Sequence, residues 1–121
     1  RAAQQMLADG VVVIFAGGTG NPYFTTDTGA TLRALEAECD ALFKATQVDG
    51  VYDSDPKKNL EAKRYTEVSY DDVIAKELKV MDMTAISMAR ENKLPIIVFK
   101  QENENSLTNA LSGKGNYTII K

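Results

Sequence analysis

Residues 11–28 read VVVIFAGGTGNPYFTTDT, the most informative stretch of this chain. The apolar run 11–15 predicts a buried strand, and the glycine-rich residues 16–20 predict a tight turn. The threonine-rich residues 25–28 are typical of a helix start. A strand, turn and helix in this order present unpaired N–H groups and the positive end of the helix dipole to an anion. We therefore expect a phosphate-binding site here.

The spacing of this stretch matches neither the P-loop pattern G-x-x-x-x-G-K-[ST] nor the dinucleotide pattern G-x-G-x-x-G. An ordinary turn with helix caps is the alternative interpretation. Tyr23 and Phe24 interrupt an otherwise polar loop. Their rings could form a wall against a flat ligand or fill part of the core, and the sequence leaves both possibilities open.

Composition limits the classes of protein to which the chain can belong. Its 121 residues, 44% of them hydrophobic, suit a single domain spanning 1–121. The net charge is −3 and no basic stripe is present, so we expect no nucleic-acid partner. No apolar run reaches the roughly 18 residues of a membrane-spanning helix, so we expect no membrane partner. The single Cys39 allows no internal disulfide, which favours a cytoplasmic protein.

The chain contains no histidine. This excludes the Ser-His-Asp and Cys-His catalytic arrangements and most zinc sites. Carboxylates, lysines, hydroxyls and backbone amides remain, and they suit phosphoryl transfer, in which positioning and charge stabilisation carry most of the catalysis.

The periodicity of apolar residues predicts alternating helices and strands. We expect helices at 1–8, about 26–39, 70–78, 83–91 and 106–111, and strands at 11–15, 41–46, 95–99 and 117–120, with a short strand near 65–68. This order predicts an α/β fold with a mostly parallel sheet between helix layers, an αβα sandwich. The chain begins inside a helix and has few strands, so we also expect it to be a piece of a longer chain.

Two helices have a predicted inward face. In the helix at 26–39, Leu32, Leu35 and Cys39 form one apolar stripe. In the helix at 106–111, we expect Leu107, Ala110 and Leu111 to point inward.

Other candidate residues follow the second strand. Lys44 and Thr46 lie at its carboxyl end, where open α/β sheets bind ligands, so they could face the same crevice as residues 15–19. Lys44 either reaches an anion, extends to water or pairs with a structural carboxylate. Tyr52 could stack on a base or simply pack, and the aspartates of 49–55 do not fit the EF-hand spacing, so we expect no independent metal site. Asp82 is predicted to cap a helix rather than to catalyse.

Three motifs occur in a specific order: GTGNPYFTTD at 18–27, KATQVDGVYDSDP at 44–56 and KELKVMD at 76–82, followed by KLPIIVF at 93–99. In this order they resemble the C-terminal half of the bacterial uridylate (UMP) kinases, which have the amino acid kinase fold. The resemblance covers nearly the whole chain. It implies a cytoplasmic enzyme of pyrimidine nucleotide biosynthesis that transfers the γ-phosphate of ATP to UMP with Mg²⁺. It also implies a homohexamer with GTP and UTP as effectors.

The resemblance assigns roles to individual residues. The implied UMP-binding residues are Thr19, Gly20, Asn21, Pro22, Tyr23, Phe24, Thr25 and Thr26. The implied ATP-binding residues are Thr46, Tyr52 and Asp55, and the residues implied to organise the reacting phosphates are Asp27 and Lys44. Asp82 matches a family aspartate with a structural role.

The chain departs from this family in one large respect. The family's N-terminal half, which carries a lysine-and-glycine phosphate loop and further UMP contacts, has no counterpart here. We therefore expect these residues alone not to phosphorylate UMP at a useful rate. Two alternatives stay open: a non-catalytic nucleotide-binding fragment, or another amino acid kinase that acts on a carboxylate or carbamate.

Overall fold

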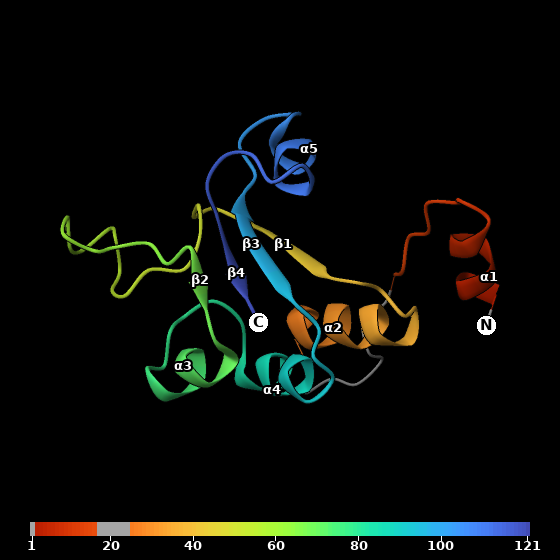
Figure 1. Ribbon diagram of the computed structural model, residues 1–121, viewed down its shortest axis with the longest axis horizontal. Coiled ribbons are helices and arrows are strands. Elements are labelled where there is room, and N and C mark those ends of the chain that lie inside the picture. Colours follow the sequence, from red (N-terminus) through yellow and green to blue (C-terminus); the bar gives the residue numbers. More distant parts are fainter. Residues whose placement is uncertain (1, 17–24) are drawn as a thin grey trace.

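The computed structural model describes residues 2–16 and 25–121. In this part of the chain, four strands form one sheet in the order β1-β3-β4-β2 (Figure 1). Their bounds are β1 Leu42–Thr46, β2 Glu67–Val68, β3 Ile96–Lys100 and β4 Tyr117–Ile120. β1 runs parallel to β3 and β2 runs parallel to β4, whereas β3 and β4 are antiparallel. The sheet is therefore mixed, with two of its three pairings parallel as predicted.

Five helices accompany this sheet in the described residues: α1 Ala2–Ala8, α2 Thr26–Glu36, α3 Tyr70–Ala75, α4 Met83–Glu91 and α5 Ser106–Leu111. Figure 1 shows α2, α3 and α4 together on one side and α5 at the opposite end of β3 and β4. It also shows α1 apart from the sheet, and none of the α1 residues is buried. The predicted bounds of α4, α5 and β4 are confirmed.

The core lies between α3, α4 and one face of the sheet. Ala85, Ile86 and Ala89 of α4 are fully buried and belong to the same cluster as Ile96 and Ile120. Burying one such isoleucine contributes roughly 1.5–3 kcal/mol. On the other face of β3, the ring of Phe99 meets that of Phe43 edge to face, at 6.5 Å between centroids. The protein thus has an α/β fold in which helices accompany a single sheet, as the sequence predicted.

The strand predicted at Val11–Phe15 is wrong. Residues 11–16 form no strand, and the side chains of Val12 and Ile14 are each 90% exposed. A strand exists by pairing with a neighbouring strand, and no strand of the described residues pairs with this segment. The apolar composition of residues 11–15 indicates a tendency to form a strand. It does not indicate whether a neighbouring strand is present to pair with.

The predicted inward stripe of α2 is also wrong, apart from Leu35, which packs against the core. The helix ends at Glu36, so Cys39 lies beyond it and is exposed. The buried face of α2 consists instead of small residues: Thr28, Gly29, Thr31 and Ala34. Small side chains face the core because α2 packs against α4, and close packing of two helices favours little side-chain bulk at the contact.

The inward face of α5 was predicted too broadly. Ala110 is buried, as expected, but Leu107 and Leu111 are 46% and 62% exposed. A helix of six residues presents less than two turns, so a single position meets the sheet.

The five helices end in the same way. After each helix, the second residue beyond it adopts a positive φ and the next N–H donates back into the helix, as in the Schellman motif. The residues with positive φ are Gly10, Glu38, Glu77, Lys93 and Gly113. Three of them carry a side chain in a conformation that favours glycine. None of the helices among residues 2–16 and 25–121 has the length and apolar character to cross a bilayer.

Candidate functional site

A cavity of about 520 Å³ opens at the carboxyl end of β1, and we name it cavity A. Its walls come from Lys44 and Thr46 of β1, Val98 of β3, residues 76–80 after α3, and Val48, Gly50 and residues 52–58 of the loop that follows β1. The volume falls in the range of small-molecule sites. The carboxyl end of a parallel strand is also the place where open α/β sheets bind ligands.

Lys44 links three parts of the molecule at the base of cavity A. Its Nζ lies 3.1 Å from Oδ1 and 3.2 Å from Oδ2 of Asp27, and it also donates to the carbonyl oxygen of Val80. Both charged side chains are about one quarter exposed. A lysine at this depth requires an anionic or polar partner. The sequence left open an anionic ligand, water or a structural carboxylate, and in this structure the charged partner is the carboxylate of Asp27.

Thr46 stabilises the turn that the chain makes at the end of β1. Its Oγ1 donates to the carbonyl oxygen of Val48 at 2.6 Å and accepts from the N–H of Val48 at 2.8 Å. This local turn starts the loop that forms one wall of cavity A. The hydroxyl proton is therefore engaged, and one lone pair of Oγ1 remains for a ligand.

Tyr52 lies half-buried in the wall of cavity A. Its hydroxyl donates to Oδ1 of Asp49 at 2.6 Å. This hydrogen bond, together with burial and the charge of Asp49, raises the pKa of Tyr52, while the Arg64 guanidinium opposes the shift. The phenol therefore stays protonated at neutral pH and serves as a donor and a ring surface.

Asp55 is exposed on the same loop. Its Oδ1 accepts from the N–H of Lys57 at 2.9 Å, which closes a turn. The second carboxylate oxygen has no hydrogen-bond partner in the described part of the chain. It is thus available to a hydroxyl or amine of a ligand.

The start of α2 is tied to the start of α4. Thr25 is the N-cap of α2 and accepts from the N–H of Thr28 at 3.3 Å. The hydroxyls of Thr25 and Thr28 both donate to the carboxylate of Asp82, which itself caps α4 by accepting from the N–H of Ala85. Burial alone would raise the pKa of Asp82, but the hydrogen bonds from Thr25, Ala85, Thr28 and Thr84 outweigh it and lower that pKa.

The structure brings part of the expected site together. Lys44, Thr46, Tyr52 and Asp55 line cavity A, and the ion pair of Lys44 places Asp27 beside it. Thr25 and Thr26 lie exposed at the start of α2. The other expected residues, Thr19, Gly20, Asn21, Pro22, Tyr23 and Phe24, lie outside the described residues.

The sequence analysis missed four lysines of cavity A: Lys57, Lys58, Lys76 and Lys79. With Lys44 they face three acidic residues of the wall, Asp53, Asp55 and Glu77. The lysine pairs at 57–58 and 76–79 were a visible signal, but charged runs are usually solvated surface. An excess of cations around a cavity suits an anionic ligand such as a phosphate.

No group of three or more His, Cys, Asp or Glu side chains is placed to hold a metal ion in the residues that the structure describes. Magnesium is bound in nucleotide sites by one or two carboxylates together with phosphate oxygens. Asp27, next to Lys44, is a carboxylate in a suitable place for such a shared site.

Comparison with known proteins points to one family. The sequence profile of the amino acid kinase family matches residues 1–100. A uridylate kinase from Hyphomonas neptunium is 56% identical over 120 residues, which make up 99% of this chain and 48% of that protein.

Solved structures agree with the sequence comparison. The UMP kinase of Ureaplasma parvum superposes with a TM-score of 0.94 at 39% identity, covering 99% of this chain and 52% of the other. The UMP kinase of Bacillus anthracis gives 0.93 at 39% identity, covering 99% and 50%. The chain thus spans about half the length of the relatives it matches.

Proposed function

Because the chain belongs to the amino acid kinase family, we propose that it forms about half of a nucleoside monophosphate kinase acting on UMP. The similarity to uridylate kinases at 55–57% identity supports this assignment. The observation that carries it is the ion pair between Lys44 and Asp27. It joins the wall of cavity A to the start of α2, where the expected UMP-binding residues Thr25 and Thr26 lie.

The proposed reaction moves the γ-phosphoryl group of ATP to UMP. A phosphate oxygen of UMP attacks the γ-phosphorus, the bond from that phosphorus to the β–γ bridging oxygen breaks, and UDP and ADP result. Catalysis of this kind rests on positioning and on stabilising charge in the transition state. The Lys44 ammonium offsets negative charge on the transferring group, and Asp27 holds that ammonium in place.

In this proposal, cavity A takes ATP. Tyr52 offers its ring, Asp55 offers a carboxylate oxygen to a ribose hydroxyl, and Thr46 shapes the loop. The lysines of the wall suit the phosphates. UMP would be bound by residues 19–26, with its phosphate near the N-terminus of α2.

Mg²⁺ fits this proposal as an ion held mainly by the ATP phosphates. When bound, it neutralises charge on the β- and γ-phosphates. Asp27 is the carboxylate of this chain that we expect to contribute to its binding. ATP and Mg²⁺ are therefore the proposed cofactors.

The remaining properties are proposed from the family. They are a homohexamer, regulation by GTP and UTP, a place in pyrimidine nucleotide biosynthesis, and a cytoplasmic location. Since the chain spans half the length of its relatives, we also propose that residues 1–121 alone bind nucleotide but turn over UMP poorly.

Titration calorimetry of the 121-residue chain with ATP and with UMP tests this proposal. We expect saturable binding of both nucleotides, and Lys44→Met should weaken ATP binding by at least about tenfold because a charge-assisted contact to phosphate is lost. The matched control is Lys121→Met, which removes a lysine paired with Glu67 at the far edge of the sheet. Thr26→Val should weaken UMP binding.

Two outcomes contradict the proposal. Equal ATP affinity in the Lys44→Met and Lys121→Met variants would remove Lys44 from the site. Binding of N-acetylglutamate, aspartate or carbamate in preference to UMP would place the chain with another branch of the family.

A further inference from the structure

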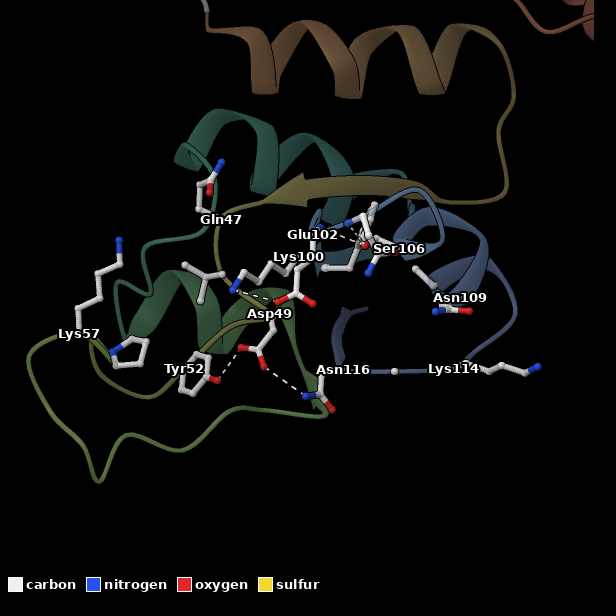
Figure 2. Close-up of a pocket in the computed structure, with 16 residues that line it drawn as sticks. Gln47, Asp49, Tyr52, Lys57, Lys100, Glu102, Ser106, Asn109, Lys114 and Asn116 are labelled. Carbon is white, nitrogen blue, oxygen red and sulfur yellow. Dashed lines mark hydrogen bonds and ion pairs between the residues drawn. The ribbon is translucent and has the colours of Figure 1, made fainter.

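A second cavity, cavity B, of about 550 Å³ lies beyond Tyr52 (Figure 2). Its walls come from the loop after β1, from the end of β3, from α5 and from the residues before β4. Cavities A and B share Val48, Tyr52, Pro56 and Lys57. Tyr52 therefore lies with three other residues at the boundary between two cavities at the same end of the sheet.

Asp49 and Asn116 line cavity B and not cavity A. Figure 2 shows the Asp49 carboxylate between the Tyr52 hydroxyl and the Asn116 amide. Oδ1 accepts from Tyr52 at 2.6 Å, and Oδ2 accepts from Nδ2 of Asn116 at 3.4 Å. Both carboxylate oxygens thus accept a hydrogen bond, one from a residue of the loop after β1 and one from a residue of the segment before β4.

The backbone around Tyr52 is fixed independently of this carboxylate. Tyr52 forms a β-bridge with Arg64, and the N–H of Val51 donates to the buried Thr118 hydroxyl at 2.9 Å. The N–H of Asp53 donates to the carbonyl oxygen of Lys63 at 3.0 Å. What these contacts leave free is the rotation of the Tyr52 side chain, and the hydrogen bond to Asp49 fixes that rotation.

We propose that Asp49 is a positioning residue for the donor nucleotide: it acts through the Tyr52 hydroxyl and holds the tyrosine ring in the wall of cavity A. Asn116 holds the carboxylate from its other side. This inference rests on the proposed binding of ATP in cavity A. Fixing the ring before binding lowers the entropy that the nucleotide must overcome to order it.

A double-mutant cycle tests the inference, with ATP binding to the 121-residue chain measured by calorimetry. Asp49→Ala, Tyr52→Phe and the double variant should each weaken ATP binding by the same factor, about five- to tenfold, because all three remove the hydrogen bond between Asp49 and Tyr52. UMP binding should not change. The control is Asp40→Ala, at an exposed aspartate outside both cavities.

A second readout separates positioning from general loss of structure. In the Asp49→Ala variant, ¹³C-labelled tyrosine spectra should show the pKa of Tyr52 falling toward the ordinary value, because the hydrogen bond to Asp49 is the largest cause of its shift. The signals of the other tyrosines should stay in place if the fold is retained.

The outcomes distinguish this inference from the proposed function. If Asp49→Ala binds ATP as tightly as Asp40→Ala does, the inference is overturned but the proposed function is not. Additive effects of Asp49→Ala and Tyr52→Phe also overturn it, because Asp49 would then act by another route. Absence of ATP binding by the unsubstituted chain overturns the proposed function, and the inference with it.

Discussion

Oγ1 of Thr28 lies 3.0 Å from Oδ1 of Asp82, across 54 residues of sequence. The same carboxylate accepts from the hydroxyl of Thr25 and from the N–H of Ala85. One side chain therefore fixes the first turns of α2 and α4 relative to each other. Thr25 and Thr26, the last two of the expected UMP-binding residues, lie at this start of α2, so their position depends on the N-cap residue of another helix.

Asp82→Ala should lower the free energy of unfolding by about 1–2 kcal/mol, because it removes a helix cap and leaves two threonine hydroxyls without their acceptor. Urea unfolding followed by circular dichroism measures the loss. Asp40→Ala, at an exposed aspartate, is the control and should change stability little.

The contribution of Asp82 should depend on pH. Its pKa in the folded protein lies below the ordinary value of 3.8, so the stabilisation is fully present above that value and is lost as the pH falls toward the folded pKa. Unfolding at pH 7 and near pH 3 should therefore show a smaller difference between the unsubstituted chain and Asp82→Ala at the lower pH. A difference that grows on acidification would contradict the assigned sign.

Gly50→Ala should be strongly destabilising, by about 2–3 kcal/mol. Gly50 has φ +153°, and a Cβ there would lie 2.5 Å from Oγ1 of the buried Thr118 and 2.8 Å from Cδ of Arg64. The Thr118 hydroxyl also bonds to Val51 and Tyr65, so it has no room to move. The matched control is Gly115→Ala, where φ is +80° but a Cβ meets open space. Similar losses in the two variants would show that conformation rather than the close contact dominates.

Tyr70→Phe should cost about 1–1.5 kcal/mol, because the buried Tyr70 hydroxyl donates to the carbonyl oxygen of Leu94. Burial raises the pKa of Tyr70 above 10. Its contribution is therefore present below pH 10 and is lost as the pH rises through the folded pKa. Thermal unfolding at pH 8 and pH 11 should show the two proteins converging at the higher pH. Tyr117→Phe is the control, since the Tyr117 hydroxyl makes no hydrogen bond within the described residues.

Lys93→Gly should raise the free energy of unfolding by about 0.5–1 kcal/mol, because Lys93 follows α4 with φ +56° and glycine adopts that conformation without steric cost. Glu91→Gly, two residues earlier and inside α4, should lower stability by about 1 kcal/mol. Chemical denaturation of both variants separates a conformational effect from a general effect of glycine. A loss of stability in Lys93→Gly would contradict this account of the helix end.

Local signals in the sequence predicted much of this structure. The cap at Asp82 was identified from residue type, and its side chain accepts the N–H of Ala85 as expected of a cap. The bounds of α4 were also predicted, with the cap at Asp82 marking its start. These features depend on contacts within one turn of helix, which the sequence displays directly.

Features that depend on distant partners were predicted less well. The run at 11–15 has the composition of a strand but no strand of the described residues beside it. Packing against α4 determines which side of α2 is buried. The α2 sequence alone does not show that small residues, rather than Leu32, lie on the side that packs against α4. In the site, Lys44 was identified as needing a partner, but choosing Asp27 required knowing how α2 crosses β1.

The strand order has a consequence for synthesis on the ribosome. β4 is the last strand in the sequence, yet it lies between β3 and β2, and β2 pairs with no other strand of the sheet. A nascent chain that has emerged only as far as β3 can join β1 to β3 but leaves β2 without a neighbour. We therefore expect protease resistance of the segment around Glu67–Val68 to arise only once Ile120 has left the exit tunnel.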